Sequence, residues 1–178
     1  MLQQRLAEAV GQDAVLTAPE DLAAYAFDAY TDGNLPAAVV LPASTRDVSA
    51  VVRVARELGV PIVPRGAGTG LCGGAVPIEG GVVISFARMN RILELDERNR
   101  RARVQPGVVN LDLSRAVASS NLFFAPDPSS QRVSTIGGNI ATNAGGPHCL
   151  SYGTTVNHVL ALEIVDDRGE VLAAGHFT

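Results

Sequence analysis

Two glycine-rich segments contain the residues whose types and spacing suit them to binding a ligand. The first, residues 64–74, follows a short apolar run and has glycine at every second position, at Gly66, Gly68 and Gly70. Because glycine has no Cβ, successive backbone N–H groups in such a loop can converge on a phosphate. The hydroxyl of Thr69 offers a further donor. An ordinary wide turn explains the same glycines, so this segment alone leaves both interpretations open.

The spacing of these glycines excludes two common nucleotide-binding motifs. The pattern is GxGxG rather than GxGxxG, and no predicted helix begins at the loop to direct its N-terminus at a pyrophosphate. The Gly-Lys-Ser/Thr ending of a P-loop does not follow the glycines either. We therefore expect neither a dinucleotide-binding Rossmann site nor a P-loop NTPase.

The second segment, residues 134–146, combines glycines with hydrogen-bonding side chains. Its thirteen residues include four glycines, two asparagines and three hydroxyl groups. Packing alone would favour more apolar residues, whereas amide and hydroxyl groups beside glycines suit a planar ligand with several polar atoms. A flavin is a ligand of this kind, and the second segment therefore favours the ligand-binding interpretation of both.

The composition indicates one folded domain and excludes several classes of protein. The chain has 178 residues, a formal net charge of −4 and 47% hydrophobic residues. Its basic residues are scattered, whereas nucleic-acid binding requires clustered Lys and Arg. No apolar run approaches the roughly 20 residues that span a bilayer, and the N-terminus lacks the charged-then-apolar order of a signal peptide. We expect a cytoplasmic protein without nucleic-acid partners or a transmembrane segment.

The two cysteines give no framework for a disulfide or a metal site. Cys72 and Cys149 lie far apart, and no Cys/His ligand spacing surrounds them. We expect two buried or half-buried thiols and no bound metal.

The first half of the chain predicts a helical lead-in, residues 1–36, followed by a β–α–β unit. The lead-in has a short amphipathic helix over 2–10 and a helix from Pro19 to Tyr30, with Thr17 as a capping hydroxyl. Apolar runs at 38–41 and 60–63 predict parallel strands joined by a helix that starts at Ser44 and ends at Gly59. The helix is predicted because Val48, Val51, Val52, Ala55 and Leu58 recur on one face.

The second half predicts shorter, mainly antiparallel elements. Strands are expected at 82–86, 92–95 and 102–105, a helix at 110–120 with Asn110 as N-cap, and a closing hairpin of 160–165 and 170–173. The predicted fold class is α+β, with a small parallel α/β part followed by a mainly antiparallel sheet flanked by helices.

Three segments, in order along the chain, carry a resemblance to a known family. These are residues 39–75, residues 124–130 with the sequence FAPDPSS, and residues 134–172, which begin STIGGNIATNAGG. Together they resemble the PCMH-type FAD-binding domain of the vanillyl-alcohol oxidase/p-cresol methylhydroxylase superfamily. Within it, they are similar to the flavin subunit of bacterial glycolate oxidase and related D-lactate dehydrogenases. The resemblance makes residues 37–178 an FAD-binding domain, incomplete at its C-terminus, and implies FAD between its two parts.

The resemblance also implies which residues contact the FAD. The backbone of the first segment would bind pyrophosphate: Arg65, Gly66, Ala67, Gly68, Thr69 and Gly70. Two residues of the middle segment, Pro126 and Asp127, would lie close to the cofactor. The second glycine segment would surround the ribityl chain, pyrophosphate and ring: Ser134, Thr135, Gly137, Gly138, Asn139, Ala141, Thr142 and Gly145. Gly153 and Ile164 would lie near the adenine and flavin edges.

Thr69 bears on how the FAD would be held. Some superfamily members join the flavin to a histidine in an Arg-Ser-Gly-Gly-His pattern, and Thr69 occupies that position when the patterns are aligned on Arg65. A hydroxyl does not form that bond, so the resemblance implies non-covalent FAD.

Three histidines and one arginine have alternative roles. His148 is a candidate for proton transfer, or a loop histidine hydrogen-bonded to the backbone. His158 and His176 are expected to be structural or solvated. Arg65 either steers an acidic substrate, pairs with a nearby carboxylate, or simply anchors its loop.

The resemblance implies the FAD-binding portion of a flavin-dependent dehydrogenase or oxidase for 2-hydroxy acids, with glycolate ahead of D-lactate. Hydride would pass from substrate C2 to flavin N5. Related enzymes are longer and continue into a capping domain that binds substrate, so this chain alone is expected to be inactive. Partners would include an iron–sulfur subunit, which would place the protein at the periphery of the inner membrane.

Two alternatives to this function remain from the sequence. The chain can instead be a non-catalytic flavin-binding or structural subunit whose catalytic partner is another polypeptide. A cell-wall reductase of the same superfamily is disfavoured, because it would have Gly-Ser-Asn where this chain has Gly68-Thr69-Gly70.

Overall fold

The computed structural model describes residues 1–175, which form two compact units. One unit contains residues 1–88 and the returning segment from Leu160, and the other contains Met89–Val159. Residues 1–36 belong to the same unit as the strands that follow them. The division at residue 36 and the C-terminal incompleteness stay predictions. His176 lies outside the described residues.

A four-stranded sheet forms the centre of the first unit, in the order β1-β2-β4-β3. Its strands are β1 (Val15–Leu16), β2 (Ala38–Val40), β3 (Ile62–Arg65) and β4 (Val82–Ser85). β4 pairs in parallel with both β2 and β3, and β1 pairs antiparallel with β2. The expected parallel direction of β2 and β3 is confirmed, but β4 lies between them. β3 also starts two residues later than predicted and extends to Arg65, because it follows the length of β4 as far as Ser85.

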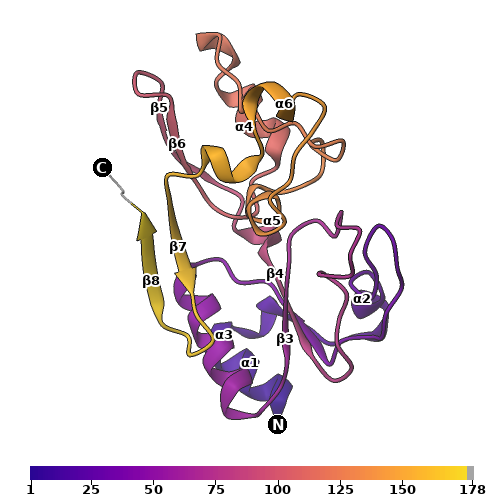
Figure 1. Ribbon diagram of the computed structural model, residues 1–178. Coiled ribbons are helices and arrows are strands. Elements are labelled where there is room, and N and C mark those ends of the chain that lie inside the picture. Colours follow the sequence, from indigo (N-terminus) through magenta and orange to yellow (C-terminus); the bar gives the residue numbers. More distant parts are fainter. Residues whose placement is uncertain (176–178) are drawn as a thin grey trace. The chain divides into compact units, whose positions relative to one another are not determined.

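Three helices accompany this sheet: α1 (Leu2–Val10), α2 (Pro19–Ala23) and α3 (Thr45–Glu57). Figure 1 shows α1 beside α3, and the two helices contact each other. α2 packs through Leu22 on the sheet face formed by Val39, Val63 and Val83. Side chains alternate across a sheet, so the neighbouring buried residues Val40 and Val82 point to the opposite face.

The helix predicted between strands β2 and β3 is confirmed with its caps. The Ser44 side chain accepts a hydrogen bond from the Asp47 N–H at 3.2 Å, as an N-cap residue does. Gly59 follows the helix in a left-handed conformation, with a φ of 64°. Five apolar residues of the helix are buried: Val48, Val51, Val52, Val54 and Ala55.

The helix predicted from Pro19 to Tyr30 is shorter than expected. It ends at Ala23, and Ala18 rather than Thr17 occupies the N-cap position. The Asp28 carboxylate accepts hydrogen bonds from the N–H groups of Tyr30 and Thr31, at 2.9 Å each. An aspartate that binds nearby N–H groups competes with helix formation, and this local turn replaces the last predicted turns.

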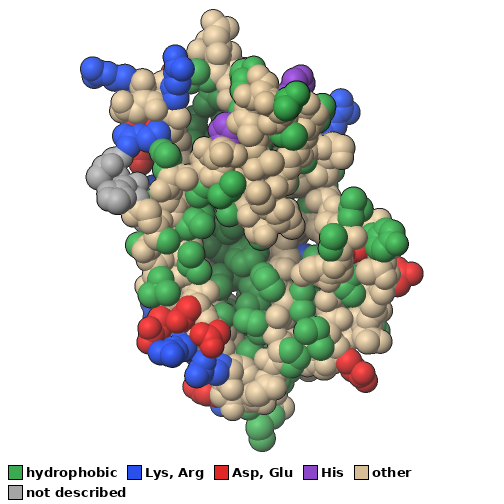
Figure 2. Space-filling view, viewed as in Figure 1, with side chains coloured by type: hydrophobic (Ala, Val, Ile, Leu, Met, Phe, Trp, Pro, Cys, Tyr) green, Lys and Arg blue, Asp and Glu red, His purple; other side chains and the backbone are tan. Residues whose placement is uncertain are grey.

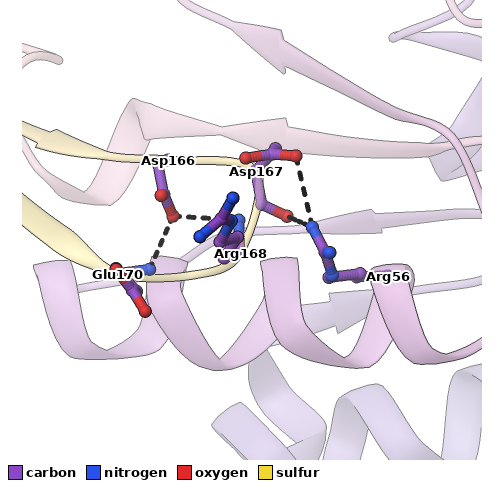
Figure 3. Close-up of polar contacts among 5 residues, drawn as sticks. All are labelled: Arg56, Asp166, Asp167, Arg168 and Glu170. Carbon is purple, nitrogen blue, oxygen red and sulfur yellow. Dashed lines mark hydrogen bonds and ion pairs between the residues drawn. The ribbon is translucent and has the colours of Figure 1, made fainter.

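The closing hairpin, β7 (Ala161–Val165) with β8 (Val171–Gly175), docks on α3 through its turn. The Gly169 carbonyl accepts hydrogen bonds from Ser49 Oγ at 2.5 Å and from the Arg53 guanidinium at 3.1 Å. Arg56 donates to the Asp167 carbonyl and carboxylate at 3.2 Å each, while Asp166 accepts within the turn (Figure 3). Figure 2 shows acidic and basic side chains gathered at the lower left, around this turn.

The second unit contains the hairpin β5 (Ile92–Asp96) and β6 (Arg101–Val104) followed by three short helices. These helices are α4 (Asn110–Ala116), α5 (Ile136–Ala141) and α6 (Cys149–Tyr152). Val108, Leu113 and Ile136 form its buried core. The helix predicted over 110–120 becomes α4 and a separate 3-10 turn at Ala118–Ser120.

Asn110 was predicted as an N-cap and is instead the first residue of α4, after Val109. Its N–H donates to the Ser134 carbonyl at 2.9 Å, and its side-chain Nδ2 donates to the Pro126 carbonyl at 3.0 Å. Asn110 therefore joins the start of α4 to the two segments that carry the predicted site residues of this unit.

Candidate functional site

The first glycine segment is a loop with unused backbone donors. It leaves β3 at Arg65 and passes through Gly68, which has a left-handed φ of 70°. Among the described residues, no protein acceptor takes a hydrogen bond from the N–H groups of residues 67–72. A Cβ at Gly70 would meet no atom within 4 Å, so the loop is open at that point. Free N–H groups around a left-handed residue form a concave site for an anion such as a phosphate.

Arg65 anchors this loop through backbone carbonyls, which is one of its three predicted roles. The side chain is only 6% exposed, and its Nη1 donates to the carbonyls of Phe27 at 2.6 Å and Ala75 at 3.1 Å. The guanidinium carbon lies 5.7 Å from the centre of the Tyr25 ring. Burial lowers the pKa of Arg65 from its ordinary value, and the Tyr25 and Asp28 charges oppose that shift. Both Nη1 hydrogens are thus used by backbone carbonyls, and burial keeps the rest of this side chain away from a substrate in solution.

Asp28 was not predicted and holds the other end of the same loop. Its Oδ2 accepts a hydrogen bond from the Gly73 N–H at 2.9 Å, and its side chain is buried. Hydrogen bonds from Tyr30 and Thr31 lower the pKa of Asp28 below its ordinary value, against the effect of burial. The spacing Asp28–Thr31 could have indicated the local turn, but no local pattern indicates the bond to Gly73.

The second glycine segment contains the helix α5, which was not predicted. Thr135 is the N-cap of α5, and its Oγ1 accepts from the Gly138 N–H at 3.3 Å. The first N–H groups of α5 are already used, because Ile136 donates to Val108 and Gly137 donates to Pro106, each at 2.8 Å. The N-terminus of this short helix is therefore fully occupied by the protein itself.

Three buried side-chain atoms near α5 have no hydrogen-bond partner within the described part of the chain. They are Ser134 Oγ, Asn139 Nδ2 and Asn110 Oδ1. A buried polar atom without a partner lowers stability, and native proteins usually supply a partner from water, an ion or a ligand. Ser134 and Asn139 are two of the residues expected to surround the FAD. Their unpaired atoms fit a ligand with several polar atoms.

Asp127 and His148 form a pair beside the end of the second segment. His148 Nδ1 lies 2.5 Å from Asp127 Oδ2, and the His148 N–H donates to Asp127 Oδ1 at 3.4 Å. The ring therefore contacts a carboxylate, whereas one interpretation expected a hydrogen bond to the backbone. Gly146 lies so close to Asp127 that a Cβ would collide with its carbonyl and carboxylate oxygens. The pair thus fixes the turn that follows Gly145.

We expect the His148→Gln substitution to raise the pKa of Asp127. The hydrogen bond from the His148 side chain is the main cause that lowers this pKa. A lowered carboxyl pKa stabilises the fold above about pH 3.9, the ordinary value, and this contribution is lost as the pH falls through the folded pKa. The variant should therefore lose stability less steeply in acid. Carbon-13 NMR titration of the Asp127 carboxyl measures the shift directly.

His158→Gln is the control for this prediction. The His158 ring contacts the Tyr152 carbonyl at 2.9 Å and makes no hydrogen bond to Asp127. An equal rise of the Asp127 pKa in both variants would contradict the assignment to His148.

The structure distributes the predicted site residues over both units. Arg65 to Gly70 and Ile164 lie in the first unit, with Ile164 half exposed on β7. The others lie in the second unit, where Pro126 is fully buried and Gly153 has a φ of 80°. Ala141 and Thr142 are exposed at the end of α5.

Three further observations concern the cysteines, the metal-ligating residue types and the helices. The expectation of buried thiols is wrong, because Cys72 and Cys149 are both exposed, each in a loop or short helix at the surface. In residues 1–175 no cluster of His, Cys, Asp and Glu has the arrangement of a metal site. None of the helices in this range is long and apolar enough to cross a membrane.

Comparison with known proteins bears out the expected resemblance. Residues 36–175 match the family model described as an FAD binding domain. The chain is 50% identical over 152 residues to the glycolate oxidase subunit GlcD of Bacillus subtilis, covering 85% of this chain and 32% of that protein. It is 43% identical over 140 residues to a D-lactate dehydrogenase of Anaerostipes hadrus, covering 79% and 29%. The chain thus spans about a third of the length of these relatives.

A solved structure has the same fold. An alkyldihydroxyacetonephosphate synthase superposes with a TM-score of 0.87 and 26% identity, over 97% of this chain and 37% of that one. The mixed α+β class, with a parallel α/β sheet followed by small antiparallel sheets, is confirmed. The free donors of the first loop and the unpaired polar atoms near α5 are features that suit a polar cofactor. Because residues 36–175 match the family model, the chain belongs to the family of FAD-binding domains.

Proposed function

We propose that the chain is the FAD-binding part of a flavin-dependent dehydrogenase or oxidase for small 2-hydroxy acids. The observation that carries this proposal is the row of unused N–H groups at residues 67–72 in a loop held at both ends. Convergent N–H groups bind phosphate oxygens, and FAD contains a pyrophosphate. The names of the relatives, glycolate oxidase subunit and D-lactate dehydrogenase, support the substrate class.

The residues of the chain divide the work of binding. The loop from Arg65 to Gly70 would hold the pyrophosphate through its backbone. Ser134 and Asn139 would each supply a buried polar atom that now has no partner. The Asp127–His148 pair would hold the turn at Gly145 in place, so that the Gly145 N–H could donate a hydrogen bond to the cofactor. When bound, FAD supplies a hydride acceptor, so that a 2-hydroxy acid gives up hydride from C2 and its hydroxyl proton to a base, and becomes a 2-oxo acid.

Several finer assignments belong to the same proposal. Glycolate is the first substrate to test and D-lactate the second. Further oxidase subunits as partners are supported by the likeness to a glycolate oxidase subunit, and an iron–sulfur subunit among them stays a prediction. Cytoplasmic location and the base that accepts the hydroxyl proton stay predictions, with His148 as a candidate for the base.

We expect the purified chain to bind FAD reversibly, because position 69 holds a threonine in place of the histidine that forms the covalent bond. Quenching of FAD fluorescence during titration measures the dissociation constant. Acid precipitation of the loaded protein should leave all the flavin in the supernatant. Flavin in the precipitate would contradict the non-covalent mode, and the absence of any binding by a folded chain would contradict the assigned cofactor site.

The non-catalytic alternative is separated by anaerobic addition of substrate. Bleaching of the flavin band on addition of glycolate or D-lactate, by the FAD-loaded chain or by a longer product of its gene, supports the enzyme. A flavin band that persists with both acids and bleaches only when a second polypeptide is added supports a flavin-binding subunit.

A further inference from the structure

The anchors of the first glycine loop include residues that precede the segment matched by the family model. That match begins at residue 36, whereas Phe27 and Asp28 lie in the turn after α2. Both residues hold the loop: the Phe27 carbonyl accepts from Arg65, and the Asp28 carboxylate accepts from the Gly73 N–H. The segment before residue 36 therefore contributes hydrogen-bond acceptors that hold the first glycine loop.

The two anchors act at opposite ends of the loop. Arg65 stands at its start and donates to Ala75 at its end, 3.1 Å away. Asp28 binds Gly73, two residues before Ala75, at 2.9 Å. Gly68, in the middle, packs so closely on the Arg65 guanidinium that a Cβ would collide with it. The loop is thus held at its start and its end, and in its middle Gly68 leaves the space that the Arg65 guanidinium occupies.

The chemistry of Asp28 leaves the ligand-binding donors free. Its carboxylate takes N–H groups from Tyr30, Thr31 and Gly73, and none from residues 67–72. The positive charge of Arg65 lies near the Asp28 carboxylate and offsets its negative charge, which would otherwise repel an anionic ligand. An anchored loop loses less conformational freedom when it binds, and this increases affinity.

We propose that Asp28 is a positioning residue for FAD: its bond to Gly73 holds the first glycine loop in the shape that binds the cofactor. This inference rests on the proposed function. It assigns to the segment before residue 36 a part in cofactor affinity, without contact between Asp28 and the FAD.

The Asp28→Asn substitution tests the proposal with little change in shape. The asparagine Oδ1 can still accept from Tyr30 and Thr31, but its Nδ2 replaces the oxygen that accepts from Gly73. We expect FAD to bind about 10-fold more weakly, the usual effect of losing one hydrogen bond to a charged group. Asp32→Asn is the matched control, since Asp32 is exposed and its removal changes the net charge equally. That variant should bind FAD like the unmodified chain.

Hydrogen exchange gives a second measurement that does not depend on FAD. In the unmodified chain the Gly73 amide should exchange more slowly than the Gly70 amide, and Asp28→Asn should remove this difference. A purely structural role would lower the thermal midpoint of the FAD-free variant without a separate loss of affinity by its folded fraction. Equal FAD affinity of Asp28→Asn and Asp32→Asn, or a Gly73 amide that exchanges as fast as Gly70 in the unmodified chain, would overturn the inference. Failure of the unmodified chain to bind FAD would overturn the proposed function as well.

Discussion

Replacing Gly137 with alanine is expected to lower the free energy of unfolding by about 1–3 kcal/mol, the usual effect of overpacking. A Cβ at this position would lie 2.6 Å from the Cβ of Pro106 and 3.0 Å from its carbonyl oxygen. Neither atom belongs to a flexible side chain, so α5 would have to move away from Pro106. The hydrogen bond from Gly137 to the Pro106 carbonyl would weaken at the same time.

The same movement should reach the cofactor site. Ser134 and Asn139, whose buried atoms are free for a ligand, flank Gly137 in the sequence and would shift with the helix. We therefore expect the Gly137→Ala variant to lose FAD affinity as well as stability. Urea unfolding followed by circular dichroism measures the first effect, and FAD fluorescence titration measures the second.

Gly138→Ala is a matched control within the same helix. Its nearest atom would be Thr135 Oγ1 at 3.2 Å, and a small side-chain rotation relieves this contact while weakening the N-cap hydrogen bond to the Gly138 N–H. Alanine also favours a helix by about 1 kcal/mol over glycine. The stability of this variant should therefore stay close to that of the unmodified chain. Equal losses of stability in the two variants would contradict the role of Pro106.

Replacing Gly169 with alanine is expected to detach the closing hairpin from α3, at a loss of about 3 kcal/mol from backbone strain and overpacking together. Gly169 is buried and has a φ of 76°, a conformation that alanine rarely adopts. A Cβ would also lie 2.6 Å from Arg53 Cγ and 2.8 Å from the Ser49 carbonyl. Ser49 and Arg53 would then lose their hydrogen bonds to the Gly169 carbonyl.

Gly80→Ala separates the strain from the steric clash. Gly80 has a similar φ of 71°, but a Cβ there would meet nothing within 4 Å. This variant should lose only about 1 kcal/mol. Hydrogen exchange of the β7 and β8 amides distinguishes the two, because only Gly169→Ala should increase it. Unchanged exchange in Gly169→Ala would show that the turn does not hold the hairpin on α3.

Elements specified by local patterns could be predicted from the sequence. The apolar face of α3, its Ser44 cap and Gly59 at its end are adjacent signals that agree with one another. The predicted end of α2 was wrong, because the Asp28 carboxylate accepts hydrogen bonds from two nearby N–H groups and this turn outweighs the helical pattern. The position of β4 between β2 and β3 was not predicted, although Pro64 of β3 has no N–H to donate to a second neighbouring strand and so favours an edge position for β3.

In the candidate site, too, the features carried by local sequence patterns were predicted and the contacts between distant residues were not. Glycine spacing and clustered polar residues indicated both binding segments, and the resemblance indicated the ligand. Anchoring by Arg65 was one of its predicted roles, but its partner Phe27 and the anchor Asp28 were not predicted, because the bonds of Arg65 to Phe27 and of Asp28 to Gly73 join residues far apart in the chain. Residue-level contacts to the FAD stay predictions.

The hairpin that returns to α3 also affects the order in which the chain can fold during synthesis. Ser49 and Gly169 are 120 residues apart, and the whole second unit lies between them in the chain. At a typical rate of about 5–20 residues per second, α3 leaves the ribosome roughly ten seconds before its partner turn. The first unit must therefore wait with the α3 surface uncovered, which gives chaperones and proteases a period in which to recognise the nascent chain.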